Sequence, residues 1–147
     1  MKKYKFILSG GGTGGHIYPA ISIAEKLLEV FPTSDITFVG SIGRMEMKTI
    51  PKYGYKIKGL FISGLKRKIF SITNVFLPFK IIISFLQSIS IILFNKPDFV
   101  IGTGGYASFP IVFVSTFFAR FFLSPKQNWE YLKYLKEKKK ELDFSKR

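Results

Sequence analysis

A glycine-rich turn near the N-terminus constrains the fold more than any other feature of this sequence. Residues 10–16 read Gly-Gly-Gly-Thr-Gly-Gly-His, so five of the six residues from 10 to 15 are glycines. An apolar run of strand length, Tyr4–Ser9, precedes the turn, and apolar residues recur at helical spacing from Ile17 to Phe31 after it. This order places backbone N–H groups and the positive end of a helix dipole at one point. The segment therefore predicts a site for phosphate or a similar anion.

Two common nucleotide-binding motifs are excluded here, because the sequence lacks a residue that each of them requires. Gly10, Gly12 and Gly15 fit the spacing of a dinucleotide-binding loop, but that motif needs an acidic residue at the end of the second strand. The second predicted strand, residues 35–40, is followed by Ser-Ile-Gly without an acid. A Walker A loop would place Lys and then Ser or Thr after Gly15, where this sequence has His and Ile.

The rest of the pattern predicts an α/β fold. Strands are expected at residues 4–9, 35–40, 55–63 and 99–101, and helices at residues 17–31, 44–50, 69–94 with a break near Pro78, and 106–120. Because βαβ units join parallel strands through right-handed crossovers, this order indicates a Rossmann-like parallel sheet with helices on both faces. We expect one such domain over residues 1–124, followed by a basic, Lys/Glu-rich helical tail over residues 125–147.

The composition narrows the classes of partner. The chain has 23 Lys and Arg against 9 Asp and Glu, a formal net charge of +14, which favours anionic partners. With no cysteine and one histidine, it lacks disulfides, thiolate metal ligands and the ligands of a structural zinc site. Nucleic acid is disfavoured, because most of the 17 phenylalanines fall in apolar runs and do not alternate with basic residues. The N-terminus lacks the apolar length of a signal peptide, which indicates a cytoplasmic chain.

His16 is the only histidine, and it falls at the first turn of the helix that follows the glycines. The positive end of that helix favours the neutral imidazole, which could accept a proton from a substrate hydroxyl. The alternative is a side chain that only forms hydrogen bonds to the loop or to the substrate. The residue pattern leaves both interpretations open.

Four segments carry a set of motifs that is typical of one enzyme family. They are Gly10–Ala20 (GGGTGGHIYPA), Gly43–Glu46 (GRME) with Ile50–Gly54 (IPKYG), Ile62–Leu65 (ISGL), and Lys96–Asp98 (KPD) with Gly102–Pro110 (GTGGYASFP). In order and spacing they resemble the MurG family of N-acetylglucosaminyltransferases, over about residues 4–115. The resemblance implies a GT-B architecture, in which two Rossmann-like domains face a cleft, with this chain as the N-terminal half.

The resemblance also implies a reaction. It is the transfer of N-acetylglucosamine from UDP-N-acetylglucosamine to undecaprenyl-pyrophosphoryl-MurNAc-pentapeptide, the lipid I to lipid II step of peptidoglycan synthesis. The implied mechanism is inverting and uses neither a metal ion nor another cofactor, and His16 matches the candidate base for the acceptor hydroxyl. Substrate contacts are implied for residues of both glycine turns, namely Gly12, Thr13, Gly14, Gly15, Gly104, Gly105 and Tyr106.

The sequence departs from the family pattern toward its C-terminus. Asn128 matches the family's donor-binding asparagine in spacing and is carried over as a substrate-binding residue, although Lys126 stands where the family has an acid. We expect the C-terminal donor domain to be absent from this chain. Two interpretations stay open: the acceptor half of a transferase that works with a separate C-terminal domain, and a truncated module that binds polyprenyl pyrophosphate and membrane without activity alone.

The most apolar segment, Phe76–Phe94, has the length of a membrane span. Its proline, lysine and serines, and its position between two strands, favour a crossover helix that is partly core and partly an apolar surface. With the basic run Lys66–Lys68 and Lys80, such a surface predicts peripheral attachment to anionic lipid at the cytoplasmic side of the cell membrane. The alternative is a plain buried crossover helix.

Overall fold

The computed structural model describes residues 3–64 and 77–122. The chain forms two compact units, Met1–Ser115 and Thr116–Arg147, and the described part of the second unit is only the end of one helix. The strands of the sheet all lie in the first unit. The predicted boundary between residues 124 and 125, the tail and Asn128 lie outside the described residues.

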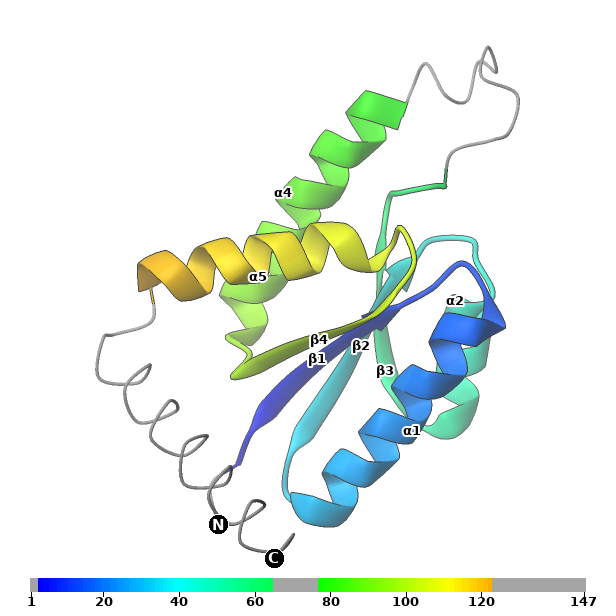
Figure 1. The fold of residues 1–147 in the computed structure, drawn as a ribbon, viewed down its shortest axis with the longest axis vertical. Coiled ribbons are helices and arrows are strands. Elements are labelled where there is room, and N and C mark those ends of the chain that lie inside the picture. The colour runs from blue at the N-terminus through cyan, green and yellow to red at the C-terminus, as the bar shows by residue number, and fades with distance from the viewer. Residues whose placement is uncertain (1–2, 65–76, 123–147) are drawn as a thin grey trace, which may run out of the picture. The chain divides into compact units, whose positions relative to one another are not determined.

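Four parallel strands form one sheet in the order β3-β2-β1-β4 (Figure 1). The strands are β1 (Lys5–Gly10), β2 (Asp35–Ser41), β3 (Lys56–Leu60) and β4 (Phe99–Gly104). β3 is shorter than the predicted strand, whereas β4 extends through the glycines at residues 102 and 104. The predicted parallel sheet is confirmed.

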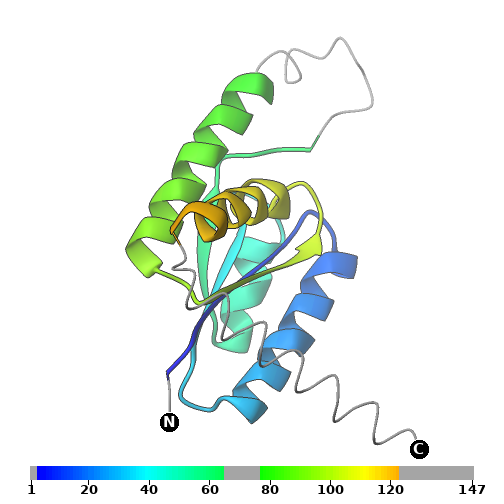
Figure 2. The ribbon, with the colours of Figure 1, turned by 60° about the vertical axis from the view of Figure 1, so that its left-hand side comes forward.

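Helices cover both faces of this sheet (Figures 1 and 2). α1 and the short α2–η1 segment lie on one face, and α4 and the first part of α5 lie on the other. The helices are α1 (Gly14–Val30), α2 (Glu46–Thr49), the 3-10 helix η1 (Ile50–Tyr53), α4 (Leu77–Asn95) and α5 (Ser108–Phe122). The predicted helix over residues 44–50 is thus a shorter α-helix followed by a 3-10 turn. The predicted start of α4 at residue 69 lies outside the described residues.

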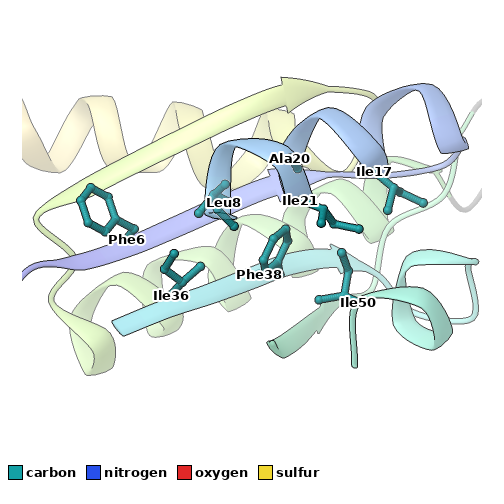
Figure 3. Close-up of a cluster of buried hydrophobic side chains, with 9 residues drawn as sticks. Phe6, Leu8, Ile17, Ala20, Ile21, Ile36, Phe38 and Ile50 are labelled. Carbon is teal, nitrogen blue, oxygen red and sulfur yellow. The ribbon is translucent and has the colours of Figure 1, made fainter. Parts of the chain in front are cut away.

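The core beneath α1 follows directly from the periodicity of the sequence (Figure 3). Ile17, Ala20, Ile21 and Ala24 recur at the spacing of one helical face and are buried. They pack on alternate residues of the two central strands, namely Phe6, Leu8, Ile36 and Phe38, together with Ile50 of η1. This packing fixes α1 on the sheet and so fixes the turn between β1 and α1.

The strand order decides where a ligand site can form. The chain runs from β1 to β2 and β3 on one side, then crosses over to β4 on the other side of β1. In an open α/β sheet, the point where the strand order reverses leaves a crevice outside the carboxyl ends of the two strands. Here those ends are Ser9–Gly10 of β1 and Gly102–Gly104 of β4, which are paired with each other. The two glycine turns therefore meet.

The Lys-Pro-Asp motif at residues 96–98 has a structural role at the amino ends of the strands, away from the glycine turns. A carboxylate oxygen of Asp98 accepts the Lys5 N–H at 2.8 Å, and the Asp98 N–H donates to the Lys5 carbonyl at 2.9 Å. These bonds join the start of β4 to the start of β1. The motif thus sets the register that brings the two glycine turns together.

Candidate active site

The first glycine loop (residues 10–16) and the second glycine loop (residues 102–106) are in direct contact. The Thr103 hydroxyl donates to the His16 carbonyl at 2.7 Å. A Cβ on Gly10 would lie 2.0 Å from the Thr103 hydroxyl oxygen, and a Cβ on Gly105 would lie 2.2 Å from the Gly11 carbonyl oxygen. No other residue type fits at these two positions without moving the backbone.

The His16 ring lies between the two loops and is half-buried. Its Nδ1 lies 3.1 Å from the carbonyl oxygen of Thr103. Because a carbonyl can only accept, this hydrogen bond requires the proton of a neutral ring to be on Nδ1. Nε2 then keeps its lone pair, and it has no hydrogen-bond partner among residues 3–64 and 77–122. This is the tautomer that a general base acting through Nε2 needs.

The second glycine loop closes over the His16 ring. Gly104 has φ 112° and Gly105 has φ 85°, a region that side-chain-bearing residues rarely adopt. A Cβ on Gly104 would lie 2.9 Å from both Cε1 and Nδ1 of His16. The predicted residues His16, Gly104 and Gly105 are therefore brought together, although they are far apart in the sequence.

The start of α1 carries unpaired backbone donors. Thr13 is the N-cap residue, with extended φ and ψ of −147° and 157°, and its side chain forms no capping hydrogen bond. The N–H groups of Thr13, Gly14 and Gly15 have no hydrogen-bond partner in the described part of the chain, whereas the His16 N–H donates to the Thr13 carbonyl. Thr13 and Gly15 are exposed. These unpaired amides and the helix dipole are the donors that a site for an anion would use, so anion binding here stays a prediction.

Gly12 differs from its neighbours because its N–H is already used. It donates to a carboxylate oxygen of Glu46 at 3.2 Å. Gly12 has φ 90°, and a Cβ there would lie 2.9 Å from the Tyr106 ring. Substrate contact at Gly12 therefore stays a prediction that does not involve its amide hydrogen.

Tyr106 packs beside the first glycine loop. Its ring lies where a Cβ on Gly64 would approach within 3.0 Å, and the Arg44 guanidinium carbon lies 6.0 Å from the ring centroid. The Tyr106 hydroxyl is buried and has no partner among the described residues. The predicted residue is thus close to the loops, and its hydroxyl is an unsatisfied polar group at the site.

Two residues of this site had no predicted role. Glu46 was noted only as part of a motif, and Thr103 only as the residue between two glycines. Their partners Gly12 and His16 are 34 and 87 residues away in sequence, so periodicity carried no signal for either contact. In the described ranges, no three His, Cys, Asp or Glu side chains gather as metal ligands would.

α4 carries an apolar surface that the core does not use. It is the one described helix long and apolar enough to cross a membrane, with mean hydropathy 2.0 and 22 % of the tested window buried. The buried side chains of α4 are Ser84, Ser88, Ile91 and Ile92, and its exposed apolar side chains are Phe79, Ile82, Ile83, Leu86, Leu93 and Phe94. The Phe85 ring of α4 contacts the rings of Phe109 and Phe113 of α5 edge-on. Phe109 and Phe113 are themselves exposed, so the apolar surface extends onto α5. α4 is therefore one-sided, with one face on the protein and the other open.

Comparison with known proteins assigns this chain to a family. Residues 6–140 match the glycosyltransferase family 28 N-terminal domain. The relative from Flavobacterium psychrophilum is 54 % identical over 116 residues, which cover 79 % of this chain and 31 % of that protein. The relative from Cytophaga hutchinsonii is 52 % identical over 111 residues, covering 76 % of this chain and 30 % of the other. Both carry the name UDP-N-acetylglucosamine–N-acetylmuramyl-(pentapeptide) pyrophosphoryl-undecaprenol N-acetylglucosamine transferase.

A solved structure has the same fold. The crystal structure of MurG from Acinetobacter baumannii aligns with a TM-score of 0.64 at 22 % identity, over 78 % of this chain and 32 % of that one. The chain thus spans about a third of the length of the relatives it matches. Since the family match extends over most of its length, this chain belongs to glycosyltransferase family 28, whose N-terminal domain it carries.

Proposed function

We propose that this chain is the N-terminal, acceptor-side half of an inverting N-acetylglucosaminyltransferase. Its donor would be UDP-N-acetylglucosamine and its acceptor undecaprenyl-pyrophosphoryl-MurNAc-pentapeptide, the substrates in the names of its relatives. A C-terminal domain, on the same polypeptide or on a separate chain, would complete the donor site.

The observation that carries the proposal is the position of His16. Its Nδ1 is hydrogen-bonded to the Thr103 carbonyl, and its Nε2 is left as an acceptor. The three residues that precede His16 carry unpaired amides. In the proposed reaction, an acceptor hydroxyl oxygen attacks the anomeric carbon as the bond from that carbon to the UDP oxygen breaks. The hydroxyl proton passes to Nε2, and the bonding pair leaves with UDP.

The unpaired amides at Thr13, Gly14 and Gly15 suit the phosphate charge of this reaction. Charge grows on the leaving diphosphate in the transition state, and fixed N–H donors at a helix N-terminus stabilise it without reorganising. Such donors also hold a diphosphate before reaction, so the same loop serves binding. Both roles need backbone groups only, which explains why this stretch is almost entirely glycine.

A chimera separates this function from a binding-only role. We would replace the 116 aligned residues of the Flavobacterium psychrophilum relative with those of this chain, and measure transfer of labelled N-acetylglucosamine to the lipid-linked muramyl-peptide. The chimera is expected to transfer sugar within about 10-fold of the unmodified relative, a range that small displacements in the site can cause. If the chimera folds and binds both substrates but transfers no sugar, the result would contradict the proposal and favour the binding-only module.

We also propose that the open face of α4 attaches the protein peripherally to the cytoplasmic side of the membrane. Its exposed apolar side chains lie on one face, whereas Ser84 and Ser88 face the protein, so the helix is suited to lie along a membrane rather than cross it. Lys80 follows the exposed Phe79 in α4, and its Nζ lies 3.2 Å from the Ser63 hydroxyl. In this proposal its charge is attracted by anionic headgroups. The predicted contribution of Lys66–Lys68 falls on residues outside the described ranges.

Vesicle binding tests this attachment. The double variant Ile82→Ser, Leu86→Ser removes two side chains that are 59 % and 62 % exposed. Its partitioning to phosphatidylglycerol vesicles in sedimentation is expected to fall at least about 10-fold, because burying each such side chain contributes roughly 1.5–3 kcal/mol. Val30→Ser, at a 60 % exposed site on α1, is the matched control and should partition like the unsubstituted chain. Equal loss in the control, or no loss in the double variant, would contradict the proposal.

A further inference from the structure

Glu46 is a charged side chain with no exposed surface, which is unusual for a carboxyl group without a counter-ion. Its exposed fraction is 0 %, and it forms no ion pair with any residue in the ranges 3–64 and 77–122. Its two oxygens are instead used by two backbone amides. Oε1 accepts the Ser41 N–H at 2.9 Å, and Oε2 accepts the Gly12 N–H at 3.2 Å. A buried carboxyl is costly unless hydrogen-bonded, so these two amides account for its position.

Glycines on two strand ends make room for this side chain. A Cβ on Gly40 would lie 2.5 Å from Cγ of Glu46. A Cβ on Gly11 would lie 2.2 Å from Oε1 and 2.7 Å from Cδ. The carboxyl group therefore lies in a slot between the ends of β1 and β2, directly beneath the first glycine loop.

The hydrogen bond to Gly12 sets the orientation of one peptide plane. In a trans peptide the N–H and C=O point in opposite directions. With the Gly12 N–H directed to Glu46, the Gly11 carbonyl points away from Glu46 and lies against Gly105 of the second loop. The same bond removes the Gly12 amide from the donors available to an anion and leaves those of Thr13, Gly14 and Gly15. Glu46 thus determines which amides of the loop face the ligand.

We propose that Glu46 is a positioning residue for the diphosphate site of the first glycine loop. It acts through the Gly11–Gly12 peptide and does not contact the substrate itself. This inference rests on the proposed function, because the diphosphate it serves is that of the proposed donor and acceptor.

The variant Glu46→Gln tests the proposal with little change of shape. Glutamine keeps one acceptor oxygen, but its NH₂ group would face the second amide, so either Gly12 or Ser41 loses its partner. We would titrate the ¹⁵N-labelled 147-residue chain with inorganic pyrophosphate and follow the Gly14 and Gly15 amide resonances. The Kd of the variant is expected to be at least about 10-fold higher, the effect of losing a hydrogen bond to a charged group. Glu29→Gln, whose side chain is 62 % exposed on α1, is the matched control and should keep the original Kd.

A kinetic readout separates positioning from general structural support. In the chimera described above, Glu46→Gln is expected to raise KM at least about 10-fold and also to lower kcat, because the loop amides hold the diphosphate before reaction and stabilise its added charge in the transition state. A loss of folded protein alone would leave KM unchanged. A variant with unchanged KM and unchanged pyrophosphate Kd would overturn the role of Glu46 and leave the proposed function standing. An unsubstituted chain that binds no pyrophosphate would overturn both.

A measurement on the unsubstituted chain covers the case in which Glu46→Gln does not fold. The Gly12 amide is expected to exchange its hydrogen at least about 100-fold more slowly than the Gly14 and Gly15 amides in the absence of ligand, because it alone has a buried acceptor. Equal exchange at these three glycines would overturn the proposal without any substitution.

Discussion

Replacing His16 with alanine is expected to lower kcat for sugar transfer by at least about 100-fold in the active chimera, the usual contribution of a positioned general base. The reason is the hydrogen bond of Nδ1 to the Thr103 carbonyl, which leaves Nε2 as the proton acceptor. KM should change much less, because the unpaired amides at the start of α1 remain in place. Steady-state kinetics with the lipid-linked acceptor would measure both constants.

His16→Asn separates the two roles left open for this side chain. The Asn side-chain NH₂ can take the place of Nδ1–H and donate to the Thr103 carbonyl, but it offers no basic nitrogen in place of Nε2. If His16 is the base, His16→Asn should be as slow as His16→Ala. Recovery of most of the activity in His16→Asn would contradict that role and show that His16 only holds the two loops together.

Gly105→Ala is expected to be the most damaging single methyl addition at this site. Gly105 has φ 85°, and its new Cβ would lie 2.2 Å from the Gly11 carbonyl oxygen, an approach that only backbone movement can relieve. We expect the free energy of unfolding to fall by roughly 3 kcal/mol, from backbone strain and overpacking together. Chemical denaturation followed by circular dichroism would measure the loss.

Gly54→Ala is the matched control for this prediction. Gly54 has nearly the same φ, 81°, but nothing lies within 4 Å of a Cβ placed there. Its substitution should cost only about 1 kcal/mol, the price of a left-handed backbone for a residue with a side chain. Equal losses of stability in the two variants would contradict the close contact between Gly105 and the Gly11 carbonyl.

The parts of the fold that follow from local spacing were predictable. β1, β2 and α1 fall close to their predicted ranges, because each carries a run with one clear period and is bounded by Gly, Pro or Ser. α2 was less predictable, since its four helical residues span barely one turn before Pro51 directs the chain into a 3-10 helix. The start of the last helix was predicted two residues early, because Gly104 and Gly105 carry the loop further before α5 begins.

The orientation of α4 could not be predicted from its composition. Apolar residues occur all round this helix, so periodicity gives no clear core face. The structure places two serines, Ser84 and Ser88, on the buried side, where each hydroxyl bonds a backbone carbonyl of the preceding turn. Leucine and phenylalanine on the other side remain exposed. The partly exposed crossover helix is therefore a result of packing rather than of the apolar pattern.

By itself, the sequence determined the alternation of strands and helices, the glycine loop at the start of α1 and the family to which its motifs belong. These properties depend on neighbouring residues, whose spacing specifies backbone conformation directly. Only the tertiary structure decided that His16 would be oriented by Thr103 and that the Gly12 amide would be taken by Glu46. Those contacts join residues 87 and 34 positions apart. They form because parallel strands bring their carboxyl ends to one edge of the sheet, where side chains distant in sequence become neighbours.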